Sequence, residues 1–190
     1  MKEYLSMASG IVFLLGFAPY IRAILKEGAR PVRASWIVWV ILDFLVIGSM
    51  IDNGSMNWMM AGVVTGASVV LLLSIKHGRP GWSWIDIASM AVASIGAGIW
   101  LVLDKGDIAL MMFLVAMVAG GIPTMFSAYQ RPEYESKWGW SMFSLSCLIQ
   151  LLAVPTWDLA NAGQPISFSI TEFTTLAIIL LSPNRSVDPA

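Results

Sequence analysis

The sequence predicts an all-α membrane protein with seven transmembrane helices, and three observations support this prediction. The first is composition: 57% of the 190 residues are hydrophobic and 12% are charged, whereas a soluble domain has roughly 25% charged residues. The second is the length of the apolar stretches, because about 20 apolar residues cross a bilayer as a helix. The third is the shortness of the polar connections, which leave no hydrophilic domain between the stretches.

Seven apolar stretches meet or nearly meet the length of a membrane span. They are residues 5–25, 34–52, 57–75, 84–103, 108–129, 138–156 and 165–182. The first is expected to be a retained span, because its apolar run is longer than the roughly 7–15 residues of a signal peptide. The sixth has the shortest apolar part, because Gln150 and Pro155 interrupt it.

The basic residues predict the orientation, because cytoplasmic loops carry an excess of Lys and Arg. Of the two alternating sets of connections, the one that includes the N-terminus holds Lys2 and Lys105. The other set holds Arg22, Lys26, Arg30, Arg33, Lys76, Arg79, Arg131, Lys137 and Arg185. The N-terminus is therefore expected outside and the C-terminus in the cytoplasm, with the bacterial inner membrane as the expected location.

An internal repeat divides the chain. The first copy reads Gly16-Phe-Ala-Pro19, then Arg30-Pro31, Ser35 and Trp39, and the second reads Gly120-Gly-Ile-Pro123, then Arg131-Pro132, Ser136 and Trp140. The first pair of prolines is 104 positions apart, and the later pairs are 101 apart. We therefore expect two triple-helix bundles, 1–80 and 106–190, joined by a linker helix in 81–105. One linker crossing makes the 3+1+3 repeat parallel.

Pro19 and Pro123 are predicted to be hinges. A proline inside a helix removes one backbone hydrogen bond and clashes with the preceding turn, and in lipid the freed carbonyl needs another partner. Equivalent kinks in the first and fifth spans would supply paired hinges for alternating access. The alternative is a static kink that only aids packing.

The 3+1+3 plan with these prolines resembles the PQ-loop and SWEET superfamily of small membrane transporters. PnuC-type vitamin-precursor transporters share this plan and favour tryptophans in the same helices. The chain departs from the motif that names the family, because Pro19-Tyr20 and Pro123-Thr124 replace Pro-Gln. The resemblance implies a transporter with polar residues of the third and seventh spans facing the substrate, and the altered motif leaves the solute undefined.

Asp43 lies midway along the second span, where a charged side chain costs roughly 2.5–3.5 kcal/mol and is usually functional. Trp39 follows Trp36 by three residues and Asp43 follows Trp39 by four, so the three residues share one helical face. We expect this face to line a substrate cavity. For the tryptophans, the alternative is an aromatic belt at the membrane interface.

Glu172 is the second intramembrane carboxyl group, and the resemblance places it in the substrate-facing part of the seventh span. Its alternative role is that of a carboxyl group near the water interface. Trp140, Ser144 and Gln150 correspond in the second copy to the region around Trp39 and Asp43, so we predict that they also bind substrate. The cavity is then chemically asymmetric.

The leading functional prediction is a transporter for a small polar solute such as a sugar, a vitamin precursor or an amino-acid-like metabolite. The alternative is a non-transporting membrane partner or sensor protein. One cysteine and one histidine predict no metal site, no cofactor and no enzyme activity, and the net charge of −1 predicts no nucleic-acid partner. Gly62 and Gly66 predict close helix contact within the bundle or in a homo-oligomer.

Overall fold

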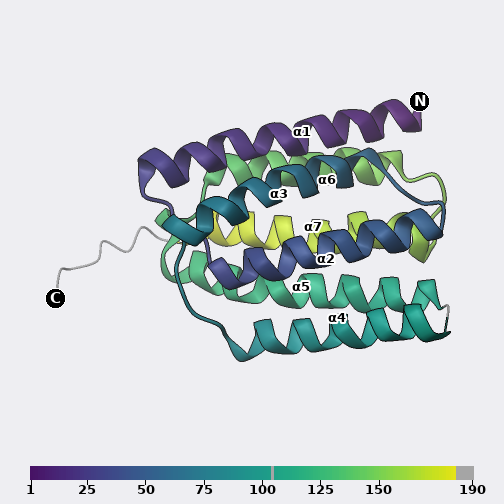
Figure 1. The fold of residues 1–190 in the computed structure, drawn as a ribbon. Coiled ribbons are helices and arrows are strands. Elements are labelled where there is room, and N and C mark those ends of the chain that lie inside the picture. The colour runs from purple at the N-terminus through teal and green to yellow at the C-terminus, as the bar shows by residue number, and fades with distance from the viewer. Residues whose placement is uncertain (104, 183–190) are drawn as a thin grey trace.

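Seven long helices run alternately in opposite directions through the part of the chain that the computed structural model describes, residues 1–103 and 105–182 (Figure 1). They are α1 (Lys2–Arg22), α2 (Arg33–Asp52), α3 (Trp58–His77), α4 (Trp84–Leu103), α5 (Gly106–Gln130), α6 (Lys137–Ala153) and α7 (Leu159–Leu181). A π-helix, η1 (Ala23–Glu27), extends α1, and a 3-10 turn, η2 (Pro132–Tyr134), follows α5. Arg185 and the expected cytoplasmic tail lie outside the described residues.

Six of these helices are long and apolar enough to span a membrane, within the described ranges. The exception is α6, which has 17 residues, in agreement with the short apolar part predicted for the sixth span. The predicted all-helical class is therefore confirmed, and six of the seven expected spans have the length and composition of membrane-spanning helices.

The seventh helix begins six residues before the position expected from the sequence. Its N-cap is Asp158, whose carboxylate accepts a hydrogen bond from the Asn161 backbone N–H at 2.9 Å. Side-chain caps of this kind satisfy an otherwise unpaired donor at the start of a helix. Pro165, which was expected to begin the helix, therefore lies inside it. The first turns of α7 contain polar residues, so a search for apolar stretches places the start of the helix too late.

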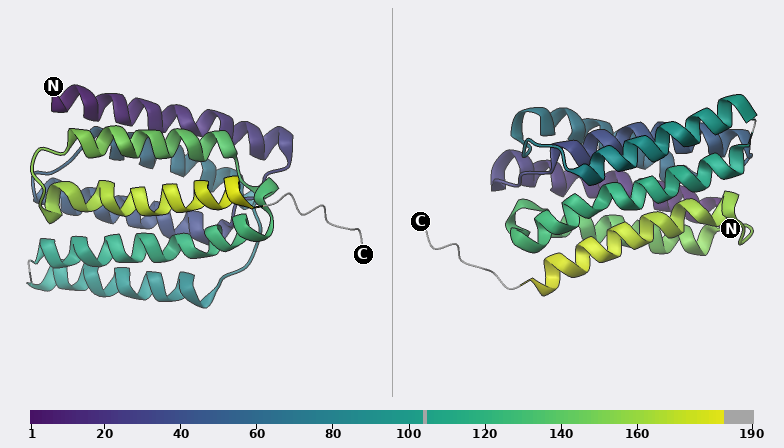
Figure 2. Two further views of the ribbon diagram at one scale, coloured as in Figure 1. Left: turned by 180° about the vertical axis from the view of Figure 1, so that it is seen from behind. Right: turned by 90° about the horizontal axis from the view of Figure 1, so that it is seen from below.

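The helices fall into two sets with the same pattern of neighbours. Before α4, helix α3 packs against both α1 and α2. After α4, helix α7 packs against both α5 and α6. The two sets meet through α1 against α6 and α2 against α5, while α4 packs mainly on α5 at the edge of the bundle (Figures 1 and 2).

Glycines allow α1 and α3 to approach at backbone distance. A Cβ atom at Gly62 would lie 2.3 Å from the carbonyl oxygen of Gly10, and one at Gly66 would lie 1.8 Å from the Phe17 ring. These two glycines are therefore used inside the bundle, one of the two alternatives left open by the sequence.

Basic residues of three connections gather around one aromatic ring at one end of the bundle. The guanidinium carbons of Arg30, Arg79 and Arg131 lie 5.9, 5.6 and 5.8 Å from the centre of the Tyr134 ring. Such distances are typical of cation–π contacts. The Arg30 backbone N–H also donates to the Tyr134 carbonyl at 3.0 Å. We call this the basic end of the bundle.

Candidate functional site

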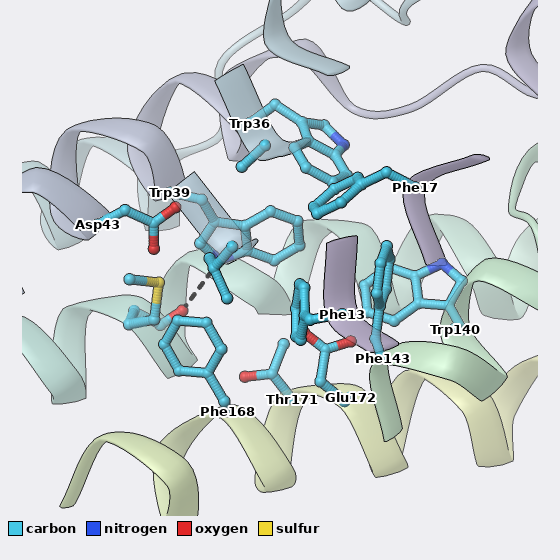
Figure 3. A pocket seen from close by; sticks show the side chains of 13 residues that line it. Phe13, Phe17, Trp36, Trp39, Asp43, Trp140, Phe143, Phe168, Thr171 and Glu172 are labelled. Carbon is cyan, nitrogen blue, oxygen red and sulfur yellow. Dashed lines mark hydrogen bonds between the residues drawn. The ribbon is translucent and has the colours of Figure 1, made fainter. Parts of the chain in front are cut away.

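A small cavity lies where the two sets of helices meet (Figure 3). Its volume is about 40 Å³, which exceeds the roughly 10–15 Å³ that a single water needs. Seven of its thirteen lining side chains are aromatic, and every helix except α4 contributes to the wall. The lining residues are Phe13, Phe17, Trp36, Trp39, Asp43, Val63, Ala67, Met117, Trp140, Phe143, Phe168, Thr171 and Glu172.

Five residues that the sequence singled out line this one cavity. They are Trp36, Trp39, Asp43, Trp140 and Glu172. They come from α2, α6 and α7, so the structure brings together side chains that are up to 136 positions apart. The predicted face of α2 does point inward, because Trp36, Trp39 and Asp43 are all buried.

Each of the two carboxyl groups of the cavity has one oxygen that finds no hydrogen-bond partner in the part of the chain that the structure describes. Asp43 is 1% exposed and Glu172 is 7% exposed. Asp43 Oδ1 and Glu172 Oε2 are buried without a hydrogen-bond partner among the described residues, and no Lys, Arg or His lines the wall. Because a buried charge is costly unless it is paired, these two oxygens are the candidate binding atoms of the cavity.

The tryptophans form an angled aromatic wall. The rings of Trp36 and Trp39 are 5.2 Å apart and nearly perpendicular, at 89°. The rings of Trp39 and Trp140 are 6.3 Å apart. The Trp39 indole N–H donates to the Met117 carbonyl at 3.2 Å (the dashed line in Figure 3), and this bond fixes the ring against α5.

A polar cluster adjoins the cavity on the side of the basic end. The Tyr20 hydroxyl and the Trp140 indole N–H both donate to Glu135 Oε2, at 2.7 and 2.8 Å. The Tyr20 ring also lies 5.4 Å from the ring of Trp36. Tyr20 and Glu135 are buried, so this cluster separates the aromatic cavity from the connections at the basic end.

Glu135 lies in the connection before α6, and its environment opposes ionisation. Burial raises the pKa of its carboxyl group from 4.5 to about 7, although the hydrogen bonds from Tyr20 and Trp140 and the charge of Arg79 act in the opposite direction. The group therefore changes its charge near neutral pH. Sequence reasoning missed it, since its partner Tyr20 is 115 positions away; the only local signal was its place five residues before Trp140.

Two predicted residues lie elsewhere. Ser144 is buried in α6 with an unpartnered hydroxyl, but it does not line the cavity. Gln150 lines a different pocket beside Lys2 and Asn57, at the end of the bundle away from the basic end. Ten helical residues separate Gln150 from Trp140, and this corresponds to about 15 Å along the helix axis, which explains why Gln150 lies outside the cavity.

The prolines predicted to be hinges lie inside α1 and α5. Pro19 immediately precedes Tyr20 of the polar cluster, and Pro123 is followed by the buried Thr124. Each proline stands three residues after a glycine that faces the other set of helices. A Cβ atom at Gly16 would lie 2.8 Å from the Phe143 ring of α6, and one at Gly120 would lie 3.0 Å from Val38 of α2.

Four phenylalanines of the wall were also missed by sequence reasoning. Phe13 and Phe17 come from α1, Phe143 from α6 and Phe168 from α7. Phe13 and Phe143 stack with ring centres 4.6 Å apart. Phenylalanine is common in any apolar helix, so only the spacing of Phe13 and Phe17, four residues apart on one helical face, could have indicated their shared role.

Comparison of the chain with known protein families, with curated proteins and with solved structures gives no match of any of the three kinds.

Proposed function

We propose that the protein is a membrane transporter that moves a small polar solute by alternating access between two three-helix units. The observation that carries the proposal is the position of the cavity. It lies between the two sets of helices, is walled by all six of their helices, and contains two unpartnered carboxyl groups. Polar groups of this kind inside a membrane protein typically mark a pathway for a substrate or an ion.

The proposal includes the parallel repeat, with α1–α3 and α5–α7 as its units and α4 as the linker. The pattern of neighbours described above supports it. In such a repeat α1 is equivalent to α5 and α2 is equivalent to α6, so the contact of α1 with α6 and the contact of α5 with α2 are equivalent. Transporters with repeats of this type bind substrate near the repeat interface. The plan is that of the PQ-loop and SWEET transporters, to which we assign the chain as part of this proposal.

Residue correspondences support the same repeat. Asn57 and Asp158 are 101 positions apart, and their side chains cap the third helix of each unit. Trp39 and Trp140, also 101 apart, contact each other across the cavity. Such a contact between equivalent residues is expected close to a pseudo-two-fold axis.

Two polar contacts are candidates for gates at opposite ends of the cavity. At the basic end, Glu135 accepts hydrogen bonds from Tyr20 and Trp140 and thereby joins α1 to the second unit. Toward the other end, the Asn57 amide donates to Gln164 at 2.8 Å and joins α3 to α7. Alternating access requires that each contact opens while the other stays closed. Following the positive-inside rule, we assign the basic end to the cytoplasm and the N-terminus to the outside.

Thiol accessibility tests alternating access without knowledge of the solute. Thr171 lines the cavity, and Cys147 is the only cysteine, so Thr171→Cys in a Cys147→Ala background places one thiol in the wall. A membrane-impermeant maleimide should label it when added to intact cells and also when added to inverted vesicles. The matched control is Ile170→Cys in the same background, because Ile170 is the neighbouring residue on the exposed face of α7 and should be shielded by lipid.

Labelling of the Thr171→Cys protein from both sides, with the Ile170→Cys control unlabelled, is the result expected of a transporter. Labelling from one side only, or from neither side, would contradict alternating access. It would favour the alternative, a non-transporting membrane partner that holds a closed cavity.

A further inference from the structure

We propose that the solute is a small organic cation with an alkylated ammonium head group. That this cation is transported rests on the proposed function, whereas its chemical class is inferred from the cavity alone. The cavity combines two buried acids with seven aromatic rings and lacks any basic side chain. Each of these three properties selects for positive charge.

The acids select the sign of the charge. Asp43 and Glu172 each present an oxygen that no group of the described chain satisfies. A cation between them supplies the counter-charge that a buried carboxylate requires. A solute with its own carboxylate, such as an amino acid, would add a third negative group to a wall that contains no Lys, Arg or His.

The aromatic rings select the type of cation. Trp36, Trp39 and Trp140 stand at steep angles to their neighbours, with ring centres 5.2 and 6.3 Å apart. Ammonium groups are attracted to the faces of such rings within about 6 Å of the ring centre, and cages of aromatic side chains recognise methylated ammonium groups. An alkylated head also places its apolar substituents against the phenylalanines of the wall.

The shortage of hydrogen-bonding groups argues against a sugar. Apart from the two acids, the only hydroxyl of the wall belongs to Thr171, which already donates to the Ser167 carbonyl at 3.3 Å. The indole N–H groups of Trp39 and Trp140 are bonded to Met117 and Glu135, so the Trp36 indole N–H is, within the described ranges, the one unpartnered donor among the three tryptophans of the wall. A polyol would therefore leave several hydroxyls unpaired in a buried site, which costs about 1–3 kcal/mol for each group.

The size of the cavity sets an upper limit. The cavity volume of about 40 Å³ is the space that the centre of a water molecule can reach. With the water radius of about 1.4 Å added, the empty space is roughly 3.5 Å in radius if it is spherical. A compact head group fits such a space, whereas a disaccharide or a nucleoside does not.

Binding of matched probes to the purified full-length chain tests this proposal. Choline and 3,3-dimethyl-1-butanol have nearly the same shape, but only choline carries a charge. Calorimetric titration should show choline binding at least about tenfold more tightly than this neutral analogue, since a desolvated cation–π contact contributes about 2 kcal/mol. Glycine betaine, which adds a carboxylate, should bind at least about tenfold more weakly than choline. Equal affinity for choline and the neutral analogue would overturn the proposal.

A further probe separates two kinds of ammonium head. Ethanolamine has the same charge as choline but donates hydrogen bonds. Tighter binding of choline is the result expected of a site for an alkylated head group, and it would assign the recognition mainly to the rings. Tighter binding of ethanolamine would contradict the alkylated head group and assign the recognition mainly to Asp43 and Glu172. If neither cation binds, the proposal is wrong.

Isosteric variants locate the charge. Asp43→Asn and Glu172→Gln should each weaken the binding of the preferred cation by about tenfold or more. The controls are Ser144→Ala, a buried polar residue outside the cavity, and Glu133→Gln, a solvent-exposed carboxylate; both should bind normally. Unchanged affinity in both acid variants, each verified as folded by its thermal melt, would overturn the assignment.

Transport assays separate this inference from the proposed function. In proteoliposomes, radiolabelled choline should enter faster than in liposomes that contain the Asp43→Asn variant. Choline that binds but does not cross would uphold the cation site and contradict the transporter. Choline uptake that the neutral analogue inhibits as strongly as unlabelled choline does would uphold the transporter and contradict the cation site.

Discussion

The two halves of the bundle, α1–α3 and α5–α7, have the same pattern of helix neighbours but different polar groups. In each half the third helix packs between the other two, and in each half a side-chain cap begins that third helix. The carboxyl groups do not follow this pattern. At the offset of 101, Asp43 corresponds to Ser144 and Glu172 corresponds to Leu71.

The paired tryptophans show the same difference. The Trp39 indole donates to a backbone carbonyl, that of Met117, whereas the Trp140 indole donates to the Glu135 carboxyl group. The counterpart of Glu135 is Ala34. Under the proposed repeat, the two halves share their helix neighbours, while Asp43, Glu135 and Glu172 each occur in one half only. For Asp43 and Glu172, which have an unpartnered oxygen, this is expected if the acids serve a ligand rather than the packing.

The largest effect is expected at the glycines of the third helices, Gly62 and its counterpart Gly163. A Cβ atom at Gly62 would meet the backbone carbonyl of Gly10 at 2.3 Å, whereas one at Gly163 would meet the flexible end of Leu114 at 2.9 Å. Gly62→Ala should lower the free energy of unfolding by about 3 kcal/mol and Gly163→Ala by about 1 kcal/mol. Denaturation in mixed micelles, followed by circular dichroism, measures both, and equal losses would contradict the difference in packing.

A smaller difference is expected between Trp140→Phe and Trp39→Phe. Both changes remove an indole N–H and a similar volume. The first also deprives the buried Glu135 of a donor and should cost about 2 kcal/mol, whereas the second frees a helix carbonyl and should cost about 1 kcal/mol. Thermal melts of the two variants provide the comparison. A greater loss for Trp39→Phe would show that the cluster around Glu135 adds no stability.

The third expected difference is a gradual pH dependence of stability, which Glu135 brings to the second half alone. Its folded-state pKa of about 7 lies above the ordinary value of 4.5, so the folded state binds more protons between these values. The stability linked to this group is fully present below about pH 4.5 and is lost as the pH rises through 7, with a slope of at most about 1.4 kcal/mol per pH unit.

Melts from pH 4.5 to 8 for the wild type and Glu135→Gln check this dependence. The difference between the two proteins, rather than either curve alone, isolates Glu135 from other acids. Parallel curves would show that Glu135 has the same pKa in the folded and unfolded states. If the wild type instead gained stability relative to Glu135→Gln as the pH rises, folding would lower the pKa of Glu135 rather than raise it.

Much of the helical framework was predictable from the sequence because apolar length is a local property. The expected span 34–52 and the observed α2 (Arg33–Asp52) differ by one residue. The start of α7 was not predictable in this way, because its first turns contain Asn161 and Gln164. Their polar groups are satisfied by partners such as Thr156 and Asn57, and partners of this kind do not appear in an apolar count.

The wall of the cavity was predictable in part. Trp140 was found through the internal repeat and Glu172 through the family resemblance, and both line the cavity, whereas the residues of α2 were found through a pattern on one helix. Trp36, Trp39 and Asp43 share a face of α2 and do line the cavity. Glu135 and Tyr20 could not be paired from the sequence, because the packing of α1 against α6 creates their contact. Gln150 was expected to line the cavity but does not. The proposed repeat indicates which residues are equivalent, but it does not indicate how far the cavity extends along the helix axes.

The presence of two acids and no base in the cavity has an electrical consequence. A monovalent cation balances one carboxylate, so the loaded cavity becomes neutral only when a proton occupies the other. Each uncompensated charge that crosses the membrane field changes the energy by about 2.3 kcal/mol per 100 mV. If the protein is the transporter proposed above, the number of protons that accompany each cation decides whether the membrane voltage acts on the loaded cavity, on the empty cavity or on neither.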